Sequence, residues 1–213
     1  RLAAQGHSLA LVDPSSQLLE LACQKVEQTR AGALLGRYVL PGREVAQLVQ
    51  TYGEASFDGA YSSFGALNCE PHLEPVFEGL RRLLKPGGHL VLSLIGRYCP
   101  TEVGWFLLHG QVEEAARRLG PGPVMAAAFP KGPKDVATYY VSLGECTRLL
   151  ARARFERVHA EAMPWLWPPP GLDFLVRRHP LLFGALRRLE ERGAGLPGVR
   201  NLGDHFLGVW RAT

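Results

Sequence analysis

The sequence predicts an α/β fold, in which a mostly parallel sheet is the middle layer of a three-layer sandwich with helices on both faces. Two observations predict it. Short apolar runs with strand character alternate with longer segments of helical periodicity along most of the 213 residues. The run from His89 to Ile95 is almost continuously apolar, which is typical of a strand buried on both faces of a parallel sheet.

The first half of the chain alternates regularly. An apolar strand stops at Asp13, Ser15 or Ser16 is placed to cap the helix that follows, and Pro14 is tolerated in a first helical turn. A strongly amphipathic helix later in this half has glutamates early and arginines late, which complements the helix dipole. The expected elements are, in order, strand 8–12, helix 14–26, strand 37–40, helix 45–49, strand 57–63, helix 73–85 and strand 89–95.

The second half is less regular. Ser142 and Glu145 have the spacing of a capping box, and Pro180 interrupts a helical pattern. The Gly/Pro-rich stretch 120–134 predicts a long loop that could act as a lid. The expected elements are helix 101–119, helix 142–154, strand 155–163, helical pieces over 172–192 and strand 205–211. We expect one domain over residues 1–213, with 101–140 and 164–203 as substrate-side insertions or a lid.

Composition limits the class of protein. Nearly half of the residues are apolar and 21% are charged, which fits one compact domain. The sequence has neither a long uninterrupted apolar run nor a secretory signal pattern, so we expect a cytoplasmic protein without a transmembrane segment. The four cysteines lack metal-ligand spacing, and we expect no metal. The net charge of +4 comes from arginines spread over several helices, so nucleic acid is not the expected partner.

Two segments at strand ends could carry chemistry. Asp13 ends an apolar strand, where a carboxylate can accept hydrogen bonds from both hydroxyls of a ribose. The same residue could simply begin the next helix. The stretch from Ser62 to Asn68 is rich in small and polar residues, which let a ligand approach the backbone, although an ordinary turn needs such residues as well.

Three motifs in this order resemble the class I, Rossmann-like S-adenosylmethionine-dependent methyltransferases. They are VDPS, FDGAYSSFGALN and LRRLLKPGGHLVLS, and the resemblance covers residues 1 to about 98. The expected strands 155–163 and 205–211 look like the terminal antiparallel hairpin of that family. The resemblance implies S-adenosylmethionine as cofactor, with Asp13 on its ribose. It also implies that Arg43 and Glu44 border the adenine, and that Ser62, Ser63 and Phe64 flank the methionyl part.

The resemblance also implies an element that the printed chain lacks. The family's first strand and its glycine-rich turn would precede Arg1. That strand lies centrally in such sheets, between the strand ending at Asp13 and the strand ending near Ser62. We therefore expect a fragment of a longer protein, with two unpaired strand edges in the middle of the sheet.

The catalytic residue is left open by the sequence. Methyl transfer can proceed by positioning alone, with at most one general base. His72 and Tyr98 follow expected strand ends and are weak candidates. For the substrate side we expect Asn68, His72, Tyr98, Tyr139 and Tyr140, with Trp165 and Trp167 as further aromatic candidates and Trp105 in the core.

The predicted function is transfer of a methyl group to an oxygen, nitrogen or carbon atom of a small molecule, which could be apolar or aromatic. Two alternatives remain open. Asp13, an acid at the end of the expected strand 8–12, also suits a nucleotide-dependent oxidoreductase. The missing glycine-rich turn would also suit a non-catalytic interaction module.

Overall fold

The computed structural model describes residues 2–29, 31–120, 122–127, 134–166 and 173–213. Its strands are β1 (Leu9–Asp13), β2 (Leu34–Val39), β3 (Phe57–Ser62), β4 (Leu84–Ile95), β5 (Val124–Ala127), β6 (Lys134–Thr138), β7 (Phe155–Met163) and β8 (His205–Ala212). Its α-helices are α1 (Ser16–Thr29), α2 (Leu48–Tyr52), α3 (Glu74–Leu83), α4 (Pro100–Leu108), α5 (Val112–Ala116), α6 (Leu143–Arg152), α7 (Asp173–Arg178) and α8 (Pro180–Gly193). Short 3₁₀ turns are η1 (Ala3–Gln5), η2 (Gly42–Gln47), η3 (Ala66–Cys69) and η4 (Arg117–Leu119).

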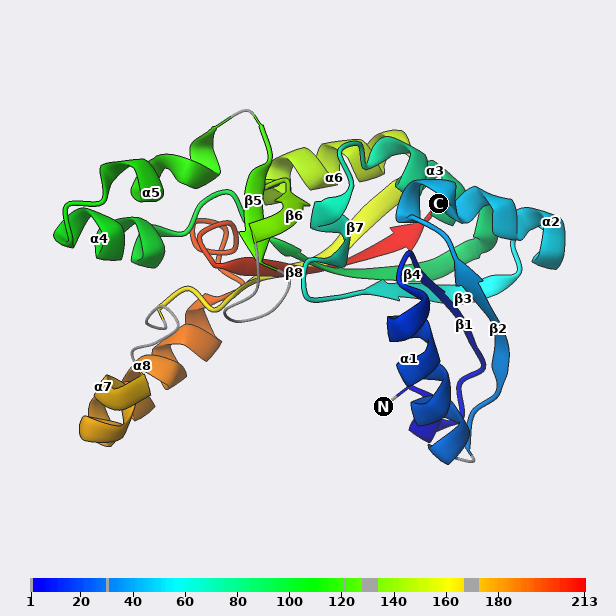
Figure 1. Ribbon diagram of the computed structural model, residues 1–213, viewed down its shortest axis with the longest axis horizontal. Helices are drawn as coiled ribbons and strands as arrows, with labels where there is room; N and C mark the ends of the chain where they lie inside the picture. Colours follow the sequence, from blue (N-terminus) through cyan, green and yellow to red (C-terminus); the bar gives the residue numbers. More distant parts are fainter. Residues whose placement is uncertain (1, 30, 121, 128–133, 167–172) are drawn as a thin grey trace.

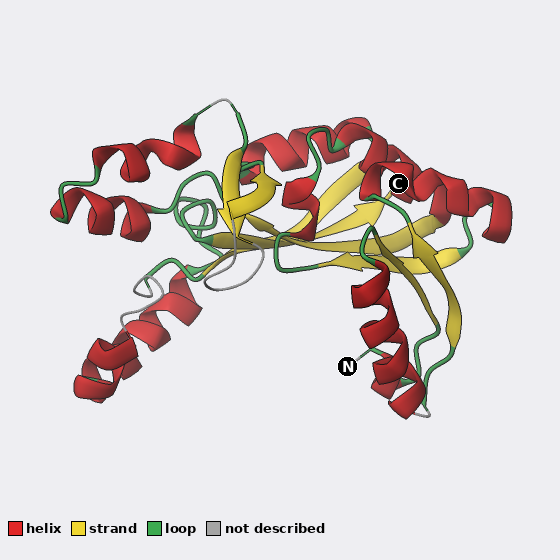
Figure 2. Cartoon of the chain, viewed as in Figure 1, coloured by secondary structure: helices red, strands yellow, loops and turns green. Residues whose placement is uncertain are grey.

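The main sheet has the strand order β3-β4-β8-β7. Strands β3 and β4 run parallel, and β8 is antiparallel to both β4 and β7. The expected α/β architecture with a closing antiparallel hairpin is therefore confirmed, and the main sheet is mixed, with one parallel and two antiparallel pairings. Figure 1 shows α3 and α6 over one face of this sheet, with α1 on the other side next to β1. Figure 2 shows the alternation of helices and strands that produces the layers.

Strands β1 and β2 form a separate parallel pair. Among the described residues, no strand joins β1 to β3, so each of these strands has one edge without a ladder partner. The side chains of β3 are partly or largely exposed, although β4 beside it is almost wholly buried toward its carboxyl end. Strands β1 and β3 are therefore both edge strands among the described residues.

The core lies between the main sheet and the helices α3 and α6. Leu90, Leu92 and Leu94 of β4 point into it, and all three are fully buried. Phe77 of α3 and Trp210 of β8 fill the same core and are likewise fully buried. Burial of large apolar side chains of this kind stabilises a fold by roughly 1.5–3 kcal/mol each. A smaller cluster of Val45, Leu48 and Leu83 packs α2 and η2 against α3.

Three predicted boundaries were wrong. The predicted helix 73–85 ends at Leu83, because the backbone of β4 becomes extended at Leu84. The predicted helix 101–119 is divided into α4, α5 and η4, with Gly110 at a positive φ of 70° between the first two. The predicted loop 120–134 contains β5 and the first residue of β6 instead, and these two strands pair antiparallel, with Val124 opposite Thr138 and Met125 opposite Ala137. In a two-stranded ladder, only every second residue of a strand exchanges hydrogen bonds with the partner strand. Prolines that lie outside β5 therefore leave its hydrogen bonds to β6 intact.

The helical segment after β7 follows the prediction more closely. Pro180 separates α7 from α8 and is the first residue of α8, where its missing N–H costs nothing. Ser142 caps α6, its hydroxyl accepting a 3.1 Å hydrogen bond from the Glu145 amide, as the capping-box spacing predicted.

Within the described part of the chain, no helix is both long and apolar enough to cross a membrane.

Candidate functional site at the strand ends

The loops that follow β2 and β3 meet at one side chain, Glu70. Its carboxylate accepts hydrogen bonds from the Arg43 amide (3.3 Å) and from the Arg43 guanidinium (3.2 Å). Glu70 is 7% exposed, whereas the Arg43 side chain is 52% exposed, so solvent still screens this ion pair from the arginine side. A Cβ added at Gly42 would lie 3.0 Å from Leu67, which shows how closely the two loops approach. The strand ends of both parallel pairs are therefore tied together.

Asp13 lies near this junction. It is the last residue of β1, and its charge, after burial and Glu70, contributes to raising the pKa of the Cys69 thiol. One carboxylate oxygen, Oδ1, accepts a hydrogen bond from the Ser15 amide at 2.8 Å. The other oxygen has no hydrogen-bond partner among the described residues. The helix-start role is therefore present, because Ser15 in turn accepts from the Leu18 amide, and one oxygen remains available to a ligand.

The turn after β3 has an unusual backbone. Phe64 has a positive φ of 55°, followed by Gly65 at 71°. A positive φ costs a bulky non-glycine residue of the order of 1 kcal/mol. The Phe64 side chain is nevertheless 89% exposed, so no packing contact offsets that cost. Ser62 and Ser63, which precede it, are partly buried. The three residues expected to flank the methionyl part thus form a strained turn with an apolar ring on the surface.

Asn68 joins this turn to two other segments. Its amide nitrogen donates to the carbonyls of Ile95 (3.1 Å) and Tyr139 (2.7 Å), and its amide oxygen accepts from the Ile95 N–H (2.8 Å). The backbone carbonyl of Asn68 also accepts from the Tyr139 N–H at 2.7 Å. Asn68 is 1% exposed and its amide is fully occupied by backbone groups. It holds the site together from within, and only a backbone shift would bring its side chain to a substrate.

The remaining cofactor-side residues, Arg43 and Glu44, lie in η2 directly after β2. The Arg43 guanidinium is about half exposed and paired with Glu70. Glu44 accepts a hydrogen bond from Gln47 at 3.0 Å, within its own helical turn. Both residues follow the carboxyl end of β2, next to the carboxyl end of β1 that carries Asp13. Their contacts with a cofactor remain a prediction.

The four other substrate-side residues fall into two groups. His72 and Tyr98 are exposed, in the loops after η3 and β4 respectively. Tyr139 and Tyr140 are partly buried in the segment that leaves β6 and pairs through Val141 with Gly96. Burial raises the pKa of the Tyr140 phenol, whose ring lies 5.0 Å from the Arg118 guanidinium.

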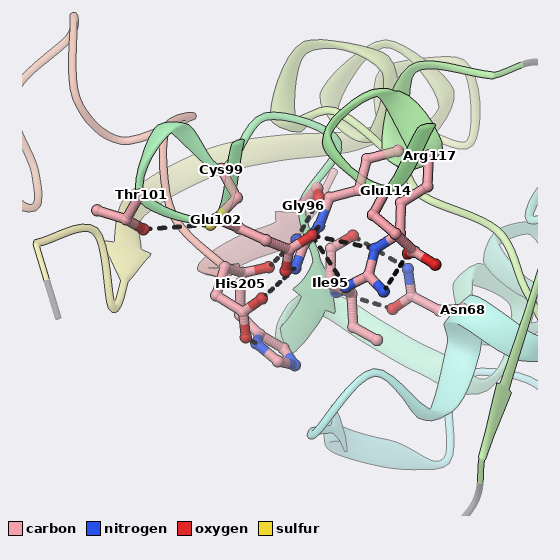
Figure 3. Close-up of polar contacts among 11 residues, drawn as sticks. Asn68, Ile95, Gly96, Cys99, Thr101, Glu102, Glu114, Arg117 and His205 are labelled. Atoms are coloured by element: carbon pink, nitrogen blue, oxygen red, sulfur yellow. Dashed lines mark hydrogen bonds and ion pairs between the residues drawn. The ribbon is translucent and has the colours of Figure 1, made fainter. Parts of the chain in front are cut away.

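A buried ion cluster lies just beyond the carboxyl end of β4 (Figure 3). Arg118 is 4% exposed and its guanidinium contacts the carboxylates of Glu102 and Asp204. It also donates to the Gly96 carbonyl at 2.9 Å. Arg117 donates to the same Glu102 at 3.0 Å. The cluster therefore fixes the α4–α5 segment to the carboxyl end of β4 and the amino end of β8.

Charge balance in this cluster is set by its partners. Burial alone would lower the pKa of Arg118, but its hydrogen bonds to Glu102 and Asp204 outweigh burial and raise that pKa. Burial would raise the pKa of Asp204, but hydrogen bonds from His205 and Arg118 hold it at about 2. Cys99, Glu102 and Asp204 also bring possible metal-ligating atoms within 4.8 Å of one another. The Arg118 guanidinium already supplies the positive charge there.

The tryptophans take different places. Trp105, expected in the core, was wrongly assigned: it is only partly buried, and its ring lies 4.1 Å from the His109 ring on α4. Trp165 packs against α8, where its indole N–H donates to the Glu190 carbonyl at 3.2 Å. Trp167 lies outside the described residues.

Two residues important to this region were not singled out from the sequence. The sequence analysis did not consider Glu70, and it counted Arg118 only among the arginines that are spread over several helices. The partners of both are distant in sequence, 27 residues for Glu70 and Arg43, and 86 for Arg118 and Asp204. A spacing pattern within one helix or loop carries no signal for such pairs.

A comparison with family models matches residues 1–92 to a methyltransferase domain. Among curated proteins, the hybrid PKS-NRPS synthetase poxE of Penicillium oxalicum is 36% identical over 78 residues, which is 33% of this chain. The chain spans only 2% of the length of that relative.

Solved structures with a similar fold cover almost the whole chain. A S-adenosylmethionine-dependent methyltransferase from Methanosarcina mazei superposes with a TM-score of 0.60 at 16% identity, covering 99% of this chain and 84% of that one. One from Mesorhizobium loti gives a TM-score of 0.52 at 19% identity, covering 97% and 92%. At these identities the similarity establishes the fold.

Proposed function

We propose that this chain uses S-adenosylmethionine to methylate a small molecule, because residues 1–92 match a methyltransferase domain and the fold is similar to that of S-adenosylmethionine-dependent methyltransferases. The observation that carries the proposal is the convergence of Asp13, the Arg43 loop and the Phe64 turn at one edge, tied by Glu70. Neither the similar solved structures nor the family match favours the oxidoreductase alternative.

The chemistry of these residues fits the cofactor. Asp13 retains one carboxylate oxygen for a ribose hydroxyl, and charge-assisted hydrogen bonds of that kind are among the stronger ones in proteins. The exposed Phe64 ring offers an apolar surface, and its positive φ is the kind of strain that persists at ligand sites. Bound there, the cofactor would supply an electrophilic methyl group on a sulfonium centre.

The residues of this chain would then bind, orient and exclude water. Asp13 would fix the ribose, and the η2 backbone would border the adenine. Asn68 would hold the turn after β3 at a set distance from the end of β4. His72 and Tyr98, both exposed at this edge, are available to orient the acceptor or take its proton. Tyr139 and Tyr140 would line the acceptor side, which suits an apolar or aromatic molecule.

We further propose that a strand completes the sheet between β1 and β3. Both strands run parallel to their existing partners and each has an edge without a ladder partner among the described residues. Unpaired backbone groups that become buried cost about 1–3 kcal/mol each, so a strand in this position would be strongly favoured. It would also bring β1 with Asp13 into the main sheet.

Isothermal titration with S-adenosylhomocysteine tests the proposal. It should be run on the printed chain and on a form that retains any natural upstream sequence. Asp13→Ala should weaken binding about tenfold or more, because it removes a charged hydrogen-bond acceptor. Asp58→Ala is the matched control, because Asp58 is an exposed β3 acid paired with Lys85 at the other end of the strand.

Equal affinity of Asp13→Ala and the unaltered protein would contradict the role of Asp13. Absence of binding by both forms would contradict the cofactor assignment and favour a non-catalytic interaction module.

A further inference from the structure

Helices α7 and α8 form an arm that extends from the main sheet, away from α1, β1 and β2 (Figure 1). The carboxyl-terminal turn of α8 is its anchor. There the Glu190 carboxylate accepts hydrogen bonds from the amides of Trp165 (2.7 Å) and Leu166 (3.1 Å). The Ala194 carbonyl accepts another from the Ala162 amide of β7, at 3.0 Å. The arm is therefore held firmly at its base.

One face of α8 is apolar and open to solvent. Leu181, Ala185 and Leu189 recur every four residues along it, and Leu182 lies beside them. Leu181 is 90% exposed, and Leu182 and Leu189 are each more than half exposed. Phe183, Leu186 and Glu190, spaced by three and four residues, form the partly buried face instead. The helix thus has a second apolar face in addition to the one turned toward the protein.

Charges on α8 are sorted between these faces. Arg188 and Arg192 each follow a member of the exposed apolar face by seven residues, or two helical turns, so they border that face. The acids lie elsewhere. Glu190 faces the protein and bonds to Trp165, while Glu191 pairs with Arg187 at 2.9 Å. The exposed face therefore presents leucines with arginines and without a carboxylate.

The short helix α7 adds the same chemistry at the tip of the arm. Phe174 is more than half exposed, and Arg177 and Arg178 are exposed one turn later. Apolar side chains bordered by arginines match the boundary of a bilayer, where acyl chains lie next to anionic headgroups. We propose that the α7–α8 arm docks the protein onto an anionic lipid surface, with Leu181, Leu182 and Leu189 inserted and the arginines at the headgroups.

Vesicle flotation tests this proposal on the full chain. The probes are vesicles of phosphatidylcholine alone and of phosphatidylcholine with phosphatidylglycerol at about 2:1. The protein should float with the anionic vesicles and remain largely free with the neutral ones. Arg188→Gln with Arg192→Gln should reduce partitioning about fivefold per arginine, and raised salt should have a similar effect. Leu181→Ser with Leu182→Ser should reduce it at least tenfold, from lost apolar insertion.

Matched controls come from exposed residues elsewhere. Leu107 and Leu108 of α4 are 52% and 85% exposed, so Leu107→Ser with Leu108→Ser removes a comparable apolar surface outside the arm. Arg148→Gln with Arg152→Gln removes two exposed charges from α6. Circular dichroism should show that all variants retain their helices. Equal partitioning to both kinds of vesicle, no flotation with either, or equal losses in the control variants would each overturn the proposal.

Discussion

Replacing Asn68 by aspartate changes the site by a single functional group of nearly equal size. In the unaltered protein, the amide nitrogen of Asn68 donates to two carbonyls, those of Ile95 and Tyr139, at 3.1 and 2.7 Å. An ionised carboxylate has no hydrogen to donate, so an oxygen would face those two carbonyls at a position that is 1% exposed. Asn68→Asp therefore introduces a buried charge without a donor on that side.

The expected cost is about 3–5 kcal/mol at neutral pH, the range for an uncompensated buried charge. Burial and the facing carbonyls should raise the pKa of the introduced acid above its unfolded value. The carboxyl group is then neutral in the folded protein below that raised pKa and can again donate. The stability deficit should consequently shrink as the pH falls through the folded pKa and grow as the pH rises.

Urea denaturation at a series of pH values measures this deficit. Asn201→Asp is a matched control, because the Asn201 side-chain oxygen accepts from the Leu143 amide at the start of α6, where negative charge is favourable. It should be within about 0.5 kcal/mol of the unaltered protein at neutral pH. A deficit for Asn68→Asp below about 1 kcal/mol, or one that does not change with pH, would refute the reasoning about this residue.

Three further substitutions have expected outcomes in urea denaturation. Arg118→Met should cost about 3–5 kcal/mol, because it leaves the Glu102 and Asp204 carboxylates close together; a loss below 1 kcal/mol would contradict the cluster's role. The pKa of Asp204 is held at about 2 in the folded protein, below the value it has in the unfolded chain. The ionised carboxylate therefore stabilises the fold when the pH is above the unfolded pKa, and this contribution is lost as the pH falls through about 2. Asp204→Asn should remove about 1 kcal/mol of that acid dependence, since its side chain is 38% exposed and screened; an unchanged pH profile would contradict this. Gly208→Ala should destabilise by about 1–3 kcal/mol, because its Cβ would lie 2.1 Å from the buried Trp210 ring; a neutral effect would contradict that packing.

Much of the fold was predictable because local signals agreed with the tertiary structure. The apolar run of β4 predicted a central strand, and Leu90, Leu92 and Leu94 are fully buried in the core. The strand ends were equally predictable, since polar residues stop an apolar run. Asp13 therefore fell at the end of β1 as expected.

The rest depends on contacts that sequence periodicity does not encode. The β5–β6 hairpin was missed, because its short strands have too few alternating residues to outweigh the surrounding glycines and prolines. Asn68 was expected at a substrate, yet its amide is fully used by Ile95 and Tyr139, which is 71 residues away. Glu70 and Arg118 likewise act through distant partners. Sequence reasoning indicated an edge of the sheet for the proposed site, but it could not separate residues that would face a ligand from those that hold this edge together.

The central claim is that the ends of β1 and β3 form one site for S-adenosylmethionine. Hydrogen–deuterium exchange with and without S-adenosylhomocysteine tests it most directly, because it reports on both strand ends in one measurement. The account predicts slower exchange in residues 13–17 and 62–68 together, with little change in α6 and the α7–α8 arm. Protection confined to other segments, or none at ligand concentrations that saturate binding, would contradict it.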